Sequence, residues 1–63
     1  MREYTNYELF RLTRAELIRL DHQMMIAISQ LPALAEARTI AIINQNRIRR
    51  ELGRRDYALH LHI

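Results

Sequence analysis

The sequence predicts an all-α protein in which a short N-terminal helix precedes an antiparallel helical hairpin that self-associates, with an extended C-terminal tail. Three observations predict this class. First, apolar residues recur every three or four positions over two long stretches. Second, a helix-capping pattern precedes the first stretch, and third, a single proline separates the two stretches. The length of 63 residues allows one domain, spanning 1–63.

The first long helix is predicted over 14–31. Thr13 and Glu16 have the spacing of a capping box, in which each side chain accepts a hydrogen bond from the other's backbone N–H. Pro32 ends the helix, because the residue before a proline is disfavoured in the helical region. The apolar stripe of this helix comprises Leu17, Leu20, Met24, either Ala27 or Ile28, and Leu31.

The second long helix is predicted over 33–52, antiparallel to the first because the intervening turn is short. Gly53 directly follows the last apolar residue, where a left-handed C-cap is expected. Ile42 and Ile43 point away from the main stripe, so this helix has two apolar faces. Its main stripe comprises Leu34, Ala37, Ala41, Ile48 and Leu52.

The two ends of the chain carry weaker patterns. Thr5 and Glu8 form a second capping-box spacing, which predicts a short helix over about 6–11. At the other end, apolar and polar residues alternate, which is typical of a strand and predicts an extended tail over 56–63. A lone strand needs a partner, so this tail either frays, pairs with a copy of itself or joins a partner's sheet.

A chain of this size buries only about 60% of its unfolded surface, so its core is marginal without reinforcement. The sequence contains no cysteine, which excludes disulfides and thiolate metal sites. Self-association is then the leading reinforcement, and a dimer is expected. The second apolar edge of the helices is the predicted surface for a second copy or a protein partner, and it comprises Ile18, Met25, Ile42 and Ile43.

All ten basic residues are arginine, and the positive charge is concentrated in the second half of the chain. Five arginines lie within nine residues near the end of the second long helix: Arg47, Arg49, Arg50, Arg54 and Arg55. Three interpretations remain open for this basic cluster. It is a solvated or structural face, a surface for an acidic protein, or a contact with nucleic-acid phosphates, in which Asn44, Gln45 and Asn46 could read base edges.

The sequence favours neither an enzyme nor a cofactor-binding protein. Ser29 is the only serine and Gly53 the only glycine, so no serine triad and no glycine-rich phosphate loop can form. His60 and His62 have a spacing that can chelate a metal, but they lack a third convincing ligand, and no metal site is expected. No apolar run approaches a membrane span and no signal peptide is evident, so we expect a cytoplasmic protein without membrane contact.

Two stretches, 9–17 and 46–55, resemble short uncharacterised helical proteins encoded in phage-like and conjugative regions of proteobacterial genomes. The likeness covers about Leu9 to Asp56 and includes the cap, the apolar stripe and the arginines. It implies a small inhibitor or regulator that occupies a surface of another protein, as anti-CRISPR proteins and antiactivators do. The sequence thus predicts a non-catalytic protein-binding regulator or inhibitor, with a small nucleic-acid-binding protein using the basic cluster as the alternative.

Overall fold

The structure of the chain is a computed structural model, and it describes the backbone of residues 1–61 and the side chains of residues 1–58. Regular structure over these residues is entirely helical, which confirms the predicted all-α class. The helices are α1 (Asn6–Phe10), α2 (Arg14–Gln30) and α3 (Glu36–Leu61).

The first two helices each begin at a threonine capping box. Thr13 Oγ1 accepts from the Glu16 N–H at 3.1 Å, while Glu16 Oε1 accepts from the Thr13 N–H at 2.9 Å. Thr5 and Glu8 form the same pair of bonds, each at 3.1 Å. Both capping boxes predicted from the sequence are therefore confirmed, and they satisfy N–H groups that have no partner within the helix.

The turn between α2 and α3 differs from the prediction. Leu31 is extended (φ −88°, ψ 145°), as the proline after it requires. The Ala35 N–H then donates to the Pro32 carbonyl at 3.0 Å and closes a turn, so α3 begins at Glu36 and not at residue 33. Leu34, which the sequence placed in the core stripe, lies in this turn and is 100% exposed.

Helix α3 is longer than predicted. It continues through Gly53 to Leu61, so the predicted end at residue 52 is wrong, and Gly53 is not a left-handed cap, since its φ is not positive. The extended tail predicted over 56–63 is wrong as far as Leu61, and residues 62–63 lie outside the described residues. An existing helix extends cheaply by one residue at a time, whereas an isolated strand has no hydrogen-bonding partner.

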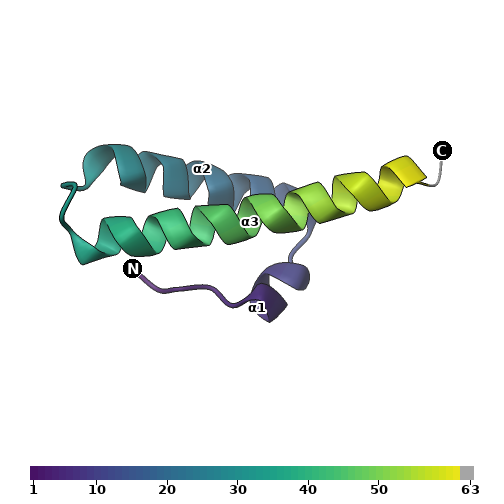
Figure 1. Cartoon of the computed structure of the whole chain (residues 1–63), viewed down its shortest axis with the longest axis horizontal. Coiled ribbons are helices and arrows are strands. Elements are labelled where there is room, and N and C mark those ends of the chain that lie inside the picture. The colour runs from purple at the N-terminus through teal and green to yellow at the C-terminus, as the bar shows by residue number, and fades with distance from the viewer. Residues whose placement is uncertain (62–63) are drawn as a thin grey trace.

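Helices α2 and α3 lie side by side and run in opposite directions (Figure 1). Cross-helix contacts fix this direction, because Arg14 reaches Asp56 and Asp21 reaches Arg49. The C-terminal end of α3 extends beyond the start of α2 and gives the molecule an elongated shape of 43 × 20 × 16 Å. The buried core is drawn from all three helices and comprises Leu9, Leu17, Met24, Ala41 and Ile48.

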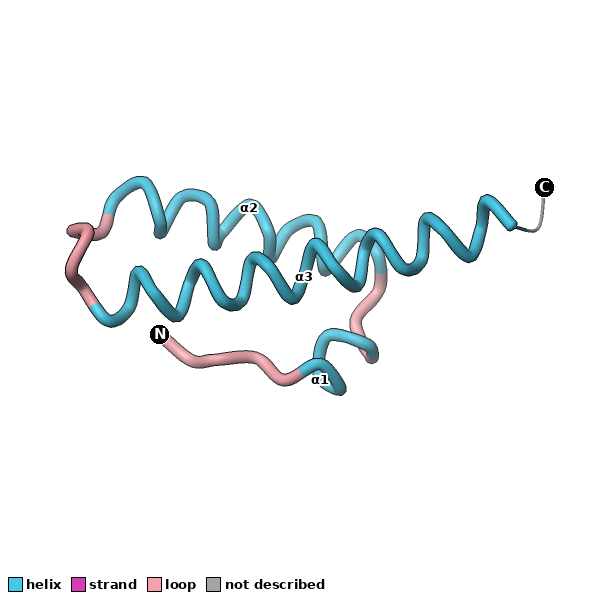
Figure 2. Tube along the Cα trace, viewed as in Figure 1, coloured by secondary structure: helices cyan, strands magenta, loops and turns pink. Residues whose placement is uncertain are grey.

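The N-terminal segment, residues 1–5, runs along α3 in the same direction and leads into α1, which packs on the same helix (Figure 2). Hydrogen bonds hold it there, since the buried Asn44 side chain pairs with the backbone of Arg2 and Tyr4. We call residues 1–5 the N-terminal strap. It covers a side of α3 that α2 leaves free.

Candidate functional site

Helix α2 carries a second apolar face that points away from the core. Ile18, Met25 and Ile26 are 46%, 44% and 46% exposed, and their spacing of seven and eight residues places them on one side of the helix. Large apolar side chains that gather on one exposed face are a recurrent mark of protein contact surfaces. We call these three residues the α2 outer face.

The four predicted partner-surface residues do not all share one side of the molecule. Arg49 of α3 donates to Asp21 of α2 at 3.2 Å, and Ile42 lies two helical turns before Arg49. Ile42 is therefore on the side of the helix pair that carries Ile18 and Met25, although it is half-buried.

Ile43 lies on the opposite edge of α3. It precedes Arg47 by one helical turn, and Arg47 Nη1 donates to the Tyr4 carbonyl and pairs with Glu3, both at 2.8 Å. Ile43 is half-buried beside the N-terminal strap, 100° around the helix from Ile42. Ile18, Met25 and Ile42 are thus brought to one side, and Ile43 is separated from them.

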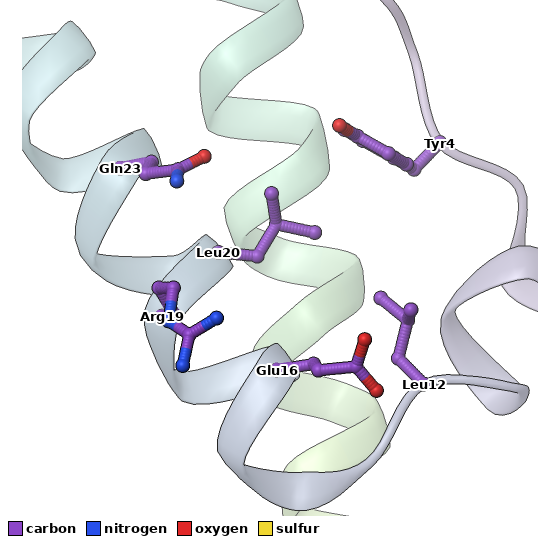
Figure 3. A pocket seen from close by; sticks show the side chains of 6 residues that line it. All are labelled: Tyr4, Leu12, Glu16, Arg19, Leu20 and Gln23. Atoms are coloured by element: carbon purple, nitrogen blue, oxygen red, sulfur yellow. The ribbon is translucent and has the colours of Figure 1, made fainter.

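A hollow of about 230 Å³ lies between α2 and the segment that precedes it (Figure 3). Tyr4 and Leu12 line it from one side and Leu20 of α2 from the other, as Figure 3 shows. Its remaining lining residues are polar and belong to α2: Glu16, Arg19 and Gln23. Pockets for small molecules usually measure about 300–1,000 Å³, so this smaller, open hollow suits one apolar side chain of a protein partner.

The hollow and the α2 outer face are continuous along α2. Gln23 at the rim of the hollow precedes Ile26 by three residues, and Arg19 precedes it by seven, so both are neighbours of Ile26 on the helix surface. The exposed surface of α2 therefore combines an apolar stripe, a hollow with an apolar floor and a charged rim. An interface typically has this composition, with apolar anchors surrounded by polar groups.

Two arginines of the basic cluster hold the fold together. Arg55 Nη2 donates to three backbone carbonyls around the end of α1, those of Leu9, Phe10 and Leu12, at 3.3, 3.0 and 2.7 Å. These include carbonyls that a helix C-terminus leaves unpaired. Arg47 ties the N-terminal strap to α3 through its bonds to Tyr4 and Glu3.

The other three arginines of the cluster lie on two different sides of α3, because Arg49 faces α2 whereas Arg50 and Arg54, four residues apart, share another side. Arg49 pairs with Asp21 on the α2 side, and Arg54 pairs with Glu51 at 2.7 Å. Glu51 also accepts from Arg55 at 2.7 Å, so one carboxylate serves two guanidinium groups. Among the described residues, Arg50 makes no ion pair or side-chain hydrogen bond. The five arginines therefore do not form one free basic surface.

Hydrogen bonds with neighbouring groups lower the pKa values of three carboxyl groups. The pKa of Glu51 is lowered chiefly by Arg54 and then by Arg55, although partial burial opposes this. Arg2 and the Thr5 backbone lower the pKa of Glu8, and the Thr13 backbone lowers that of Glu16. These glutamates are salt-bridge and capping residues, and their lowered pKa values reflect the stabilisation of the ionised carboxylates by these partners.

The described residues offer no arrangement that could hold a metal ion. No group of three or more histidine, aspartate or glutamate side chains comes together among them. The predicted chelating spacing at His60 and His62 lies outside the described side chains. None of the helices, over the residues searched, is long and apolar enough to cross a membrane.

Comparison with protein-family models, curated proteins and solved structures found no match to this chain. The resemblance to proteins of phage-like and conjugative regions therefore stays a prediction.

Sequence reasoning missed three features of this site. Asn44, considered above as a base-reading residue, is fully buried and binds the strap, and its place between Ala41 and Ile48 on the core stripe was the available signal. Ile26 belongs to the outer face, which its spacing of eight from Ile18 could have indicated. The hollow could not be found from sequence, because it depends on how the strap residue Tyr4 folds back beside α2.

Proposed function

We propose that this chain is a small non-catalytic protein-binding protein, of the regulator or inhibitor type, which folds as a helical hairpin and binds through α2. The observation that carries the proposal is the α2 outer face beside a hollow with an apolar floor. A second copy of this chain is the first candidate partner, because a 63-residue chain without disulfides gains stability from self-association. The resemblance to proteins of phage-like and conjugative regions agrees with such a role, but the proposal does not depend on it.

Nucleic-acid binding by the whole basic cluster has less support. Arg47 and Arg55 use their donors on backbone carbonyls within the chain, and Arg49 pairs with Asp21. Phosphate contacts by the whole cluster would need its five guanidinium groups to share one surface. The exposed side chains of the α2 outer face, by contrast, have no comparable partners within the described residues.

Sedimentation equilibrium of three purified chains tests self-association. The wild type is expected to dimerise, and the double variant Ile18→Glu/Ile26→Glu to dimerise roughly 30-fold more weakly, as expected when residues worth about 2 kcal/mol are lost from an interface. Thr39→Glu is the matched control, because it adds a carboxylate at an exposed position of α3. Equal association constants for all three chains would contradict self-association through this face.

Affinity capture with the same three chains tests binding to another protein. A partner held by the wild type and by Thr39→Glu, but lost by the double variant, is the expected result. Identical sets of captured proteins with all three chains, together with an unchanged oligomeric state, would contradict the proposed function. Circular dichroism of each variant establishes that the helices are intact.

A further inference from the structure

A second exposed surface combines aromatic rings with arginines where α1 meets α3. Tyr7 and Phe10 lie three residues apart on α1, and the guanidinium group of Arg54 lies 5.6 Å from the centroid of the Phe10 ring. Arg50, Arg54 and Tyr57 follow one another at spacings of four and three residues, and so share one side of α3. We call these five residues the aromatic–arginine face.

The three rings of this face are largely exposed, although the chain has few aromatic residues. Tyr7 and Tyr57 are each 67% exposed, and Phe10 is 58% exposed. A small chain that must bury apolar surface to fold gains nothing in stability from rings left in water. Their exposure therefore points to a contact outside the chain.

The charge around these rings is positive. Arg50 has no ion-pair partner in the described part of the chain, and Glu51 is the single carboxylate opposite Arg54 and Arg55. A second hollow, of about 100 Å³, lies at the α1 edge of the face. Its lining contains three arginines and comprises Asn6, Leu9, Arg47, Arg50, Glu51 and Arg54. The face thus offers guanidinium groups to an anion directly beside flat rings.

We propose that the aromatic–arginine face binds single-stranded nucleic acid, with backbone phosphates at Arg50 and Arg54 and unpaired bases stacked on Phe10 and Tyr57. Bases stack on exposed aromatic rings whatever their sequence, and arginine contributes both charge and stacking. An acidic protein segment would satisfy the arginines but would make no use of the rings. A duplex keeps its bases stacked on each other, so it too would leave the rings unused.

The test is fluorescence anisotropy of labelled twelve-residue oligo-dT and oligo-U with the full chain, from low to near-physiological salt. We expect both strands to bind, with the two arms distinguishing DNA from RNA preference. Phe10→Ala and Tyr57→Ala should each weaken binding by roughly 5- to 100-fold, as loss of a base–aromatic stack does. Arg50→Gln should reduce the salt slope by about 0.7, the value for one phosphate of a single strand.

Controls separate this site from the rest of the molecule. Tyr57→Phe keeps the ring and should retain affinity, and Arg19→Gln removes one exposed charge from α2 without touching the face. Ile18→Glu/Ile26→Glu should bind the oligonucleotides at least half as well as the wild type once salt screens its added charges. A failure of the proposed protein-binding function is thereby distinguishable from a failure of this site.

Four outcomes would overturn the proposal. One is the absence of binding to both oligonucleotides at low salt. Another is unchanged affinity in the Phe10→Ala/Tyr57→Ala double variant, and the third is tighter binding to a duplex of equal length. If a poly-glutamate peptide bound as tightly as the oligonucleotides and was insensitive to the ring variants, the face would instead be assigned to an acidic protein.

Discussion

Asn44 occupies a position on the core stripe of α3 that an apolar residue would ordinarily fill. Its amide oxygen accepts from the Tyr4 N–H at 2.8 Å, and its amide nitrogen donates to the Arg2 carbonyl at 2.8 Å. The side chain therefore pairs with the strap backbone as a neighbouring strand would. A buried amide is tolerated because both of its polar ends are satisfied.

Replacing Asn44 should therefore release the strap. Asn44→Ala is expected to lower the free energy of unfolding by about 1–3 kcal/mol, because the backbone groups of Tyr4 and Arg2 lose their partner. Urea denaturation measures this change, and hydrogen exchange of the Tyr4 amide locates it. Asn46→Ala, at an exposed neighbouring position, should change the free energy by less than about 0.5 kcal/mol. Equal effects of the two substitutions would contradict this role for Asn44.

At the scale of the elements, α3 is one continuous helix of 26 residues with a glycine inside it. Gly53 is exposed, and a Cβ atom added there would meet nothing within 4 Å. Glycine in a helix interior is destabilising because it loses more backbone entropy on folding than alanine does. Nothing in the packing around Gly53 explains its presence.

Gly53→Ala should consequently raise the free energy of unfolding, by about 0.5–1 kcal/mol. Thermal and urea denaturation provide the measurement. A synthetic chain with D-alanine at position 53 is the matched control, and it should be less stable than the wild type. If Gly53→Ala instead lowered the free energy of unfolding and D-alanine raised it, Gly53 would have to adopt a left-handed conformation and α3 would end there.

The sequence predicted the helices well where one residue pair determines them locally. Thr5 with Glu8 and Thr13 with Glu16 marked both helix starts, because a capping box is formed by residues three positions apart. The end of α3 was missed because an alternating apolar pattern and a glycine are also compatible with a helix, and an existing helix extends one residue at a time without needing a partner. The sequence could not show how the basic cluster is divided, since the backbone carbonyls that accept from Arg47 and Arg55 lie more than 40 residues away in the chain.

At the scale of the whole molecule, three ionised carboxylates stabilise the helices of a chain with a net charge of +3. Glu51 binds the two arginines that border α1, Glu8 caps α1 and pairs with Arg2, and Glu16 caps α2. The folded pKa of each of the three lies below its unfolded value. Their contribution to stability is therefore present above the unfolded pKa and is lost as the pH falls through the folded pKa.

The melting temperature should accordingly fall as the pH is lowered below about 4.5, the ordinary pKa of a glutamate. Circular dichroism melts from pH 7 to pH 2.5 measure this. Glu51→Gln should have a lower melting temperature at pH 7 and a smaller decrease on the acid side. Glu36→Gln, at a carboxylate without an ion pair in the described residues, is the control. A wild-type curve that is flat down to pH 2.5 would contradict the stabilising role of these carboxylates.

The strap is expected to dock only after α2 and α3 have paired. Helices α2 and α3 can close over the short turn at Pro32, whereas the strap must find a site 40 residues away at Asn44. Docking of the strap is therefore expected to be a late step, and its release the first step of opening. Since Tyr4 of the strap lines the hollow beside α2, each release removes part of one wall of that hollow. A partner that fills the hollow would bind only the closed form, and so would slow the departure of the strap.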